Sequence, residues 1–216
     1  MNVVTSSSPV DDLLNPSETA SRPVRILAAA GRMFIEHGYE GASMEEIAKE
    51  AAVTRQTLYN RYPDGKESLF VAVAERLWKA FPVMNVASDE RALADPRNGL
   101  QQIATEFACF WSGPLAADFL RMVIREGRRF PLLASRFDEV IQEPAMTVVR
   151  DYLSELGRRG ILVVQEPEIA ARDFMGMIDG RVLWTQVRGN SEPLARQEIE
   201  QIVDRTVDVF LRSLRH

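Results

Sequence analysis

The chain has 216 residues, with 26 Lys and Arg against 31 Asp and Glu, so its formal net charge is −5. That balance excludes a protein that holds nucleic acid through bulk positive charge over its whole surface. Apolar residues make up 46% of the sequence and charged residues 26%, which is typical of a folded globular protein with a sizeable core.

Cysteine and histidine are too scarce for a metal site or a disulfide. The single cysteine, Cys109, cannot form an intrachain bridge, and neither His37 nor His216 has a zinc-site spacing with it. We therefore expect no structural metal, no cofactor and a reducing, cytoplasmic location. No apolar run approaches the roughly 18 residues of a membrane span, and Asp11 and Asp12 lie where a signal peptide needs apolar residues. The sequence predicts a protein that is neither exported nor embedded in a membrane.

The hydrophobic pattern predicts an all-α fold. Apolar residues recur three and four positions apart over long stretches, and no run shows the strict alternation of a half-buried strand. The short apolar run 161–164 lies between Gly160 and Pro167, and we interpret it as a connection between helices. Residues 1–21 are rich in Ser and Pro and are expected to form a flexible arm.

Capping residues and helix breakers divide the segment that follows the arm. A first helix begins after Ser21, with Pro23 in its first turn, and is expected to end at Gly38. A second begins at Ser43, which has Glu46 three residues later as in a capping box.

The second helix is followed almost immediately by a third. Only Ala52 and Val53 separate it from the helix that begins at Thr54, and such a tight joint is typical of a helix-turn-helix. We therefore expect a three-helix domain over residues 22–66, followed by a larger helical-bundle domain for ligand binding and dimerisation over residues 67–216.

The larger domain is predicted to be a bundle of longer helices, because Pro and Gly recur where helices begin and end. The expected helices cover residues 97–112, 114–130, 131–158, 168–188 and 192–214. The last two carry apolar stripes at helical spacing together with apolar residues off the stripe, which indicates a second surface to cover. A bundle core alone is one interpretation. The interpretation we favour adds a homodimer interface formed by Phe174, Ile178, Trp184, Ile202, Thr206 and Phe210.

From Arg25 the sequence runs RILAAAGRMFIEHGYEGASMEEIAKEAAVTRQTLYNRYPDGKESLF. Its separated features follow in order: Ile-Leu-x-Ala-Ala and Phe34, Gly38-Tyr39, Ser43-x-x-x-Ile47-Ala48, Val53-Thr54-x-x-x-Leu58-Tyr59, and then an aromatic residue and Lys-Glu. On these features the segment resembles the N-terminal domain of the TetR/AcrR family of bacterial transcriptional regulators. Two departures stand out: Ala52 replaces the usual turn glycine, and the linker before Lys66 is one residue longer than the common one.

The residues of the third helix suit contact with DNA, because the second helix of a helix-turn-helix lies in the major groove. Arg55 suits a guanine edge, Gln56 or Asn60 an adenine edge, and the Thr57 methyl group a thymine methyl. We expect a second group to contact phosphates and fix the register: Ser43, Thr54, Tyr59 and Lys66.

Structural roles compete with some of these assignments. Ser43 and Thr54 are needed as helix caps in any case, and the ring of Tyr59 can cover the small domain's core. Arg55 and its polar neighbours have no such structural reason to occur together on one short helix. Between Val53 and Lys66 three cations and one carboxylate give a local charge of +2, so we expect a small basic surface in an otherwise acidic protein.

The later sequence carries a second, less specific resemblance. The stretch 120–131, with Gly160-Ile161-Leu162 and Ala170-Ala171-x-x-Phe174, is similar to the regulatory domain of the AefR-like subgroup. This resemblance implies an effector cavity inside the helices. Large apolar side chains suit a hydrophobic or aromatic molecule there, although each can also be ordinary core. The candidate ligand contacts are Phe81, Phe107, Phe110, Trp111, Met122, Arg125, Met175 and Asp179.

The sequence thus predicts a bacterial transcriptional regulator, and we favour a repressor that binds a palindromic operator in double-stranded DNA as a homodimer and is released by a small hydrophobic effector. An alternative is a dimeric helical module that binds small molecules or proteins and keeps its helix-turn-helix only as scaffold. An enzyme is disfavoured, because the sequence has no phosphate-binding glycine loop and no paired metal-ligand motif.

Overall fold

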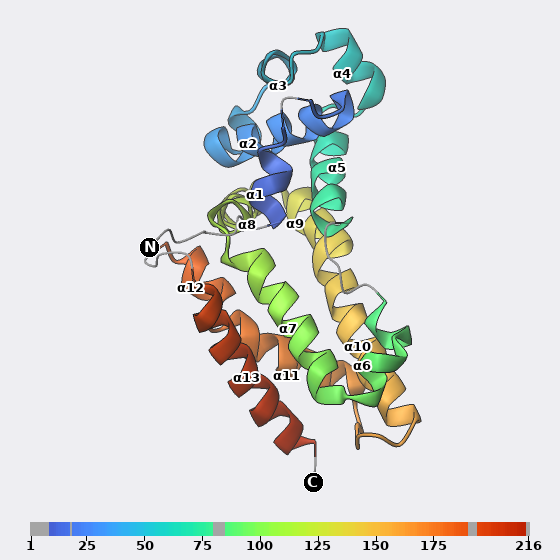
Figure 1. Ribbon diagram of the computed structural model, residues 1–216. Coiled ribbons are helices and arrows are strands. Elements are labelled where there is room, and N and C mark those ends of the chain that lie inside the picture. Colours follow the sequence, from blue (N-terminus) through green and yellow to red (C-terminus); the bar gives the residue numbers. More distant parts are fainter. Residues whose placement is uncertain (1–8, 18, 80–84, 190–193, 215–216) are drawn as a thin grey trace. The chain divides into compact units, whose positions relative to one another are not determined.

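The computed structural model describes residues 9–17, 19–79, 85–189 and 194–214. Every regular element in these ranges is helical, which confirms the predicted all-α class (Figure 1). The chain forms two compact units, each built from separate stretches of sequence. Of the described residues, the amino-terminal unit contains those from 9 to 79 and from 113 to 142, and the carboxyl-terminal unit contains those from 85 to 112 and from 143 to 214.

The amino-terminal unit contains the predicted helix-turn-helix. Its elements are α1 (Pro9–Leu14), α2 (Arg22–Gly41), α3 (Met44–Glu50), α4 (Arg55–Arg61), α5 (Lys66–Lys79), α8 (Pro114–Gly127), α9 (Pro131–Phe137) and the π-helical turn η2 (Asp138–Gln142). Gly38 interrupts α2 with φ 74° and ψ 169°, a conformation essentially reserved for glycine, so the expected helix end is confirmed there.

Side-chain caps fix the starts of α3 and α4, as the sequence predicts. The Ser43 hydroxyl accepts a hydrogen bond from the Glu46 amide at 3.1 Å, and the Thr54 hydroxyl accepts one from the Thr57 amide at 3.1 Å. These bonds satisfy amides that have no partner within the helix. The polar residues of α4 therefore begin at a fixed position.

The turn between α3 and α4 holds a strained residue. Ala52 has φ 53°, the only positive φ at a non-glycine residue in the part of the chain that the structure describes. The left-handed region favours glycine, which has no Cβ to clash with the backbone. The turn thus requires the geometry for which the family uses glycine, and Ala52 adopts it at a cost in strain.

Helices α8 and α9 belong to the amino-terminal unit, although they come more than thirty residues after α5 in the chain. Phe70 of α5 stacks on Phe119 of α8 with ring centroids 5.6 Å apart, and Phe119 in turn lies 6.5 Å from Phe137. Phe70 also meets Phe34 of α2 in an edge-to-face arrangement, with ring centroids 6.1 Å apart. The apolar face of α5 therefore needs cover from helices that come much later in the chain.

Part of the expected flexible arm is a packed helix. Val10 and Leu14 of α1 are 0% and 2% exposed, and a Cβ at Gly31 would lie only 2.4 Å from Leu14, so glycine there makes room for the leucine. Arg32 also donates a hydrogen bond to the Leu14 carbonyl. Two apolar residues four apart are enough to dock one turn of helix, a weak pattern within a Ser- and Pro-rich segment.

The carboxyl-terminal unit is a helical bundle. Its elements are η1 (Val86–Ser88), α6 (Glu90–Ala94), α7 (Pro96–Ser112), α10 (Glu143–Arg158), α11 (Pro167–Asp179), α12 (Leu183–Val187) and α13 (Arg196–Ser213). Its core includes Tyr152, whose hydroxyl donates to the Ala92 carbonyl at 2.6 Å, and the ring pair Phe174 and Phe210 at 4.9 Å. The run 161–164 forms a helix-to-helix connection, as predicted.

Two of the predicted long helices are divided. The expected helix 131–158 consists of α9, η2 and α10, because Pro144 has no N–H to donate to the carbonyl four residues earlier. The expected helix 168–188 consists of α11 and α12, with Gly180 at the break.

Within the described residues no single helix is long and apolar enough to cross a membrane. The consecutive helices α7 and α8 meet that length and composition only when they are counted together across a bend.

Candidate nucleic-acid interface

Helix α4 presents polar side chains on its outer surface. Leu58 is fully buried and anchors the helix, whereas Arg55, Gln56 and Asn60 are exposed. The amide of Gln56 donates to the side-chain oxygen of Asn60 at 2.7 Å. Two amides held one turn apart form a preorganised set of donors and acceptors of the kind that reads base edges.

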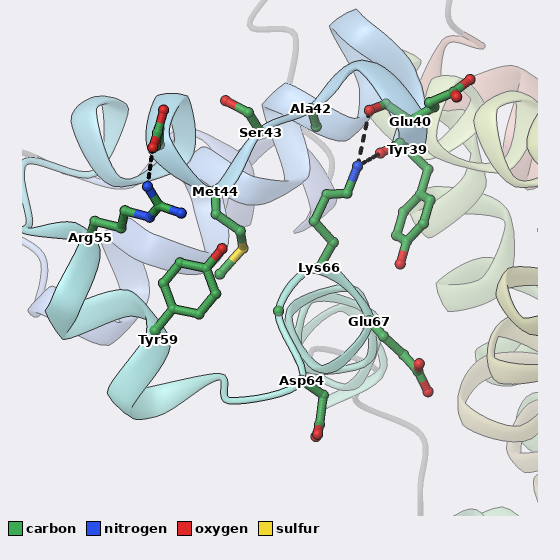
Figure 2. Close-up of a pocket in the computed structure, with 12 residues that line it drawn as sticks. Tyr39, Glu40, Ala42, Ser43, Met44, Arg55, Tyr59, Asp64, Lys66 and Glu67 are labelled. Atoms are coloured by element: carbon green, nitrogen blue, oxygen red, sulfur yellow. Dashed lines mark hydrogen bonds and ion pairs between the residues drawn. The ribbon is translucent and has the colours of Figure 1, made fainter.

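Four of the eight predicted DNA contacts line one groove of about 600 Å³ (Figure 2). The groove lies between the end of α2, the start of α3, helix α4 and the start of α5. Ser43, Arg55, Tyr59 and Lys66 contribute to its walls. The other four predicted contacts, Thr54, Gln56, Thr57 and Asn60, lie on α4 or at its cap but outside this groove.

Arg55 is held from two sides within the groove. Its Nη1 forms an ion pair with the Glu45 carboxylate of α3, and its guanidinium carbon lies 5.4 Å from the centre of the Tyr59 ring. The interaction with Tyr59, followed by the charge of Glu45, raises the pKa of Arg55 above its ordinary value. The predicted guanine-reading side chain is therefore already engaged in the DNA-free protein.

Lys66 has a structural role in addition to its predicted phosphate contact. Its Nζ donates to the carbonyls of Tyr39 and Glu40 at 2.7 and 3.0 Å and lies 5.0 Å from the Tyr39 ring centre (Figure 2). Partial burial lowers the pKa of Lys66. The lysine ties α5 to the chain that follows Gly38, and two of its three N–H groups are used inside the protein.

The net charge of the residues that line the groove differs from the net charge of the segment 53–66. Four carboxylates line the groove, from Glu40, Glu45, Asp64 and Glu67, against the two cations Arg55 and Lys66. The interval 53–66 alone gives +2, because it omits three of these acids. The expected basic patch is therefore not present in the groove, which instead mixes both signs with an excess of carboxylates.

The candidate ligand residues divide between the two units. Met122 and Arg125 lie on α8 of the amino-terminal unit, Phe81 lies outside the described residues, and the carboxyl-terminal unit contains Phe107, Phe110, Trp111, Met175 and Asp179. The apolar members within the described residues are at most 9% exposed, whereas the Arg125 side chain is 60% exposed and pairs with Glu126 at 3.2 Å.

Asp179 differs from the other ligand candidates. Its Oδ1 atom is buried and has no hydrogen-bond partner among the described residues. Burial raises the pKa of Asp179 to about 6. Because an uncompensated buried carboxylate is costly, this side chain is the strongest candidate for a polar anchor in the carboxyl-terminal unit.

The predicted dimer residues are mostly interior to a single chain. Phe174, Ile178, Thr206 and Phe210 are at most 3% exposed in the single chain, so their side chains pack within the carboxyl-terminal unit. Ile202 is half-buried, and Trp184 is 48% exposed. Val209 of α13 is also exposed, at 43%. Most residues of the predicted apolar stripes therefore pack in the core of a single protomer.

The capped helix pair with its tight turn and the outward polar face of α4 define a helical protein with a DNA-binding helix-turn-helix. Comparison with known proteins gives the same result. Residues 26–73 match the family described as "Bacterial regulatory proteins, tetR family", and residues 98–214 match "AefR-like transcriptional repressor, C-terminal domain". The chain belongs to the TetR family of transcriptional regulators. Both predicted resemblances are confirmed, and the family is one of regulators and not of enzymes.

Individual relatives extend over most of the chain. The HTH-type transcriptional regulator LmrA of Bacillus subtilis is 28% identical over 177 residues, which cover 79% of this chain and 89% of LmrA. A TetR-family regulator from Mesorhizobium loti has a similar structure, with 27% identity, a TM-score of 0.77 and coverage of 92% of this chain and 98% of that one. The flavonoid-responsive regulator FrrA gives 27% identity and a TM-score of 0.71, covering 89% of this chain and 96% of FrrA.

Proposed function

We propose that this regulator is a homodimeric repressor that binds an inverted-repeat operator through α4 and is released by a small hydrophobic or aromatic molecule. The observation that carries the proposal is the exposed polar surface of α4, held in register by the buried Leu58 and the Thr54 cap. No packing requirement accounts for several polar side chains on one short outer face.

The base contacts follow from the chemistry of that face. Arg55 can give a bidentate contact to guanine, Gln56 and Asn60 can pair with adenine, and Thr57 can contact a thymine methyl group. Tyr59 and Ser43 lie beside the groove and suit phosphates. Thr54 and Lys66 are the remaining phosphate candidates, each with part of its hydrogen-bonding capacity already used for capping.

A dimer is proposed because one such helix contacts only a few base pairs. Two helices related by a twofold axis read half-sites about 34–36 Å apart, one turn of DNA. The exposed Trp184 and Val209, with the half-buried Ile202, supply apolar surface that a second copy would cover. We expect Trp184→Arg to shift the protein toward monomer in sedimentation velocity, whereas Ile161→Arg, a matched change at another exposed apolar residue, should leave the dimer intact.

An aromatic effector is proposed from two observations. In the carboxyl-terminal unit three aromatic rings of α7 lie close together: the Trp111 ring centroid is 6.3 Å from that of Phe107 and 5.0 Å from that of Phe110. The related FrrA is described as responsive to flavonoids. Asp179 would accept a hydrogen bond from a hydroxyl group of such a molecule. Native mass spectrometry with a panel of flavonoids and simpler phenols tests this, and retention by wild-type protein but not by Asp179→Leu is the expected result.

The proposed DNA recognition is tested by selecting bound duplexes from a random library with the full chain. We expect enrichment of an inverted repeat whose half-site centres lie one helical turn apart. Failure to enrich any sequence at low salt would overturn operator binding. Enrichment of a single unrepeated site would overturn the dimeric arrangement and leave DNA binding in place.

A further inference from the structure

The ion pair between Glu45 and Arg55 places an acidic residue directly on the proposed DNA-binding surface. Glu45 is in the first turn of α3, Arg55 is the first residue of α4, and both side chains line the same groove. Arg55 is 60% exposed and Glu45 is 65% exposed. An exposed pair of this kind contributes little to folding stability, so stability does not account for it.

We infer that Glu45 is a specificity-determining residue that suppresses contact of Arg55 with DNA phosphates while leaving its donors available to a base edge. The inference rests on the proposed function, because it applies only if α4 reads DNA.

The charge of the pair determines how strongly it attracts a phosphate. Binding to random DNA is driven by cations that neutralise phosphates and release counterions. Together Arg55 and Glu45 have no net charge, so their attraction to a phosphate is largely cancelled. To gain that attraction Arg55 has to leave Glu45, and an unpaired carboxylate then faces the DNA backbone in a groove that already has excess acid. Contact with phosphate alone is therefore disfavoured.

Contact with a base edge, unlike contact with a phosphate, does not require Arg55 to leave Glu45. Guanine offers two neutral acceptors, O6 and N7, to a guanidinium group. The bond to Glu45 uses Nη1, and an arginine has five N–H donors, so donors remain for a bidentate contact without breaking the ion pair. Tyr59 supports the guanidinium from another side, with its ring centre 5.4 Å from the guanidinium carbon. The arrangement penalises phosphate contact and permits base contact.

The neighbouring acid supplies a matched control. Glu46 is on the same turn of α3 and is also exposed, but its carboxylate accepts a hydrogen bond from the Ser43 hydroxyl at 2.7 Å and has no contact with Arg55. Glutamine serves in a capping box as well as glutamate does. Glu46→Gln therefore changes the net charge by the same amount as Glu45→Gln and preserves the cap.

The experiment measures the affinity of the full chain for an operator selected by the wild-type protein and for a scrambled duplex of equal length, over a range of salt concentrations. For Glu45→Gln we expect the ratio of the two affinities to fall about tenfold, within the discrimination attributed to one bidentate base contact. The salt dependence on scrambled DNA should steepen by about 0.9, as expected for one added phosphate contact. Glu46→Gln should leave both quantities close to wild type.

Repeating the Glu45→Gln measurement in Arg55→Ala protein shows whether Glu45 acts through Arg55. In Arg55→Ala protein the added Glu45→Gln change should no longer alter the salt slope. An equal effect of Glu45→Gln with and without Arg55, or no effect in either background, would overturn the inference while the wild-type protein still binds its operator. Absence of wild-type binding to any duplex would instead overturn the proposed function on which the inference depends.

Discussion

Replacing Gly38 by alanine tests how the end of α2 is built. Gly38 has φ 74° and ψ 169°, and its carbonyl accepts the Ala42 amide at 3.1 Å. A Cβ at this position would lie 2.7 Å from Glu126 Oε1 and 3.0 Å from Arg125 Nη2. The substitution therefore combines a backbone conformation that alanine avoids with two close contacts.

The backbone conformation dominates the expected cost. A non-glycine residue in this region costs about 1–3 kcal/mol. The close contacts involve the ends of two flexible side chains, which can move away at little further cost. We expect Gly38→Ala to lower the free energy of unfolding by about 2–3 kcal/mol, which corresponds to a melting temperature about 4–12 °C lower for a chain of this size.

Urea unfolding followed by circular dichroism measures this change. Gly176→Ala is the control, because Gly176 lies within α11, has no atom within 4 Å of its added Cβ and has no positive φ. Alanine there should stabilise the protein by about 0.5–1 kcal/mol. An unfolding midpoint for Gly38→Ala equal to that of the wild-type protein would refute the conformational argument.

Of three further substitutions, two are expected to raise the free energy of unfolding and one to lower it. Ala52→Gly should raise the unfolding free energy by about 0.5–1 kcal/mol by relieving the left-handed strain, and a lower urea midpoint would contradict this. Because the pKa of Asp179 is raised to about 6, the free energy of unfolding of the wild-type protein should fall as pH rises from about 4 to 6. Asp179→Asn should remove that fall and raise the free energy of unfolding at pH 7 by up to about 3 kcal/mol. Asp173→Asn, on the exposed side of α11, should leave the fall with pH in place. Tyr152→Phe should cost about 1–2 kcal/mol in urea unfolding, because the buried Ala92 carbonyl loses its donor; an unchanged midpoint would show that this bond is dispensable.

The sequence predicts features that depend on a few neighbouring residues. Ser43 and Thr54 can be identified as caps because the amide that each binds is only three residues away. Gly38 and the two-residue turn that contains Ala52 mark helix ends in the same local way. These signals are enough to place α2, α3 and α4 and to position the polar face of α4.

Features that depend on distant residues could not be predicted in the same way. Nothing near Phe70 indicates that Phe119 will cover it, so the sequence does not show that α8 packs on α5. Glu45 lies ten residues before Arg55, and their pairing depends on how α3 crosses α4. A charge count over consecutive residues therefore predicts a basic surface where the folded groove contains more acid than base.

The residues of a dimer interface are also hard to identify from sequence. An apolar stripe does not by itself distinguish residues that fill a protomer core from residues that contact a second copy. Phe174 and Phe210 pair with each other inside one chain, whereas Trp184 and Val209, which belong to the same apolar stripes, are exposed. Burial within the protomer is needed to separate the two groups.

The central claim is that α4 reads base pairs in an inverted repeat, and parallel selections from one random library with wild-type and Arg55→Ala protein test it most directly. We expect both proteins to enrich a repeat with the same spacing. The Arg55→Ala consensus should lose its preference for guanine at one symmetry-related position in each half-site, because only the base contact of that side chain is removed. Identical consensus sequences from the two proteins, or no enriched sequence from the wild-type protein, would contradict the account.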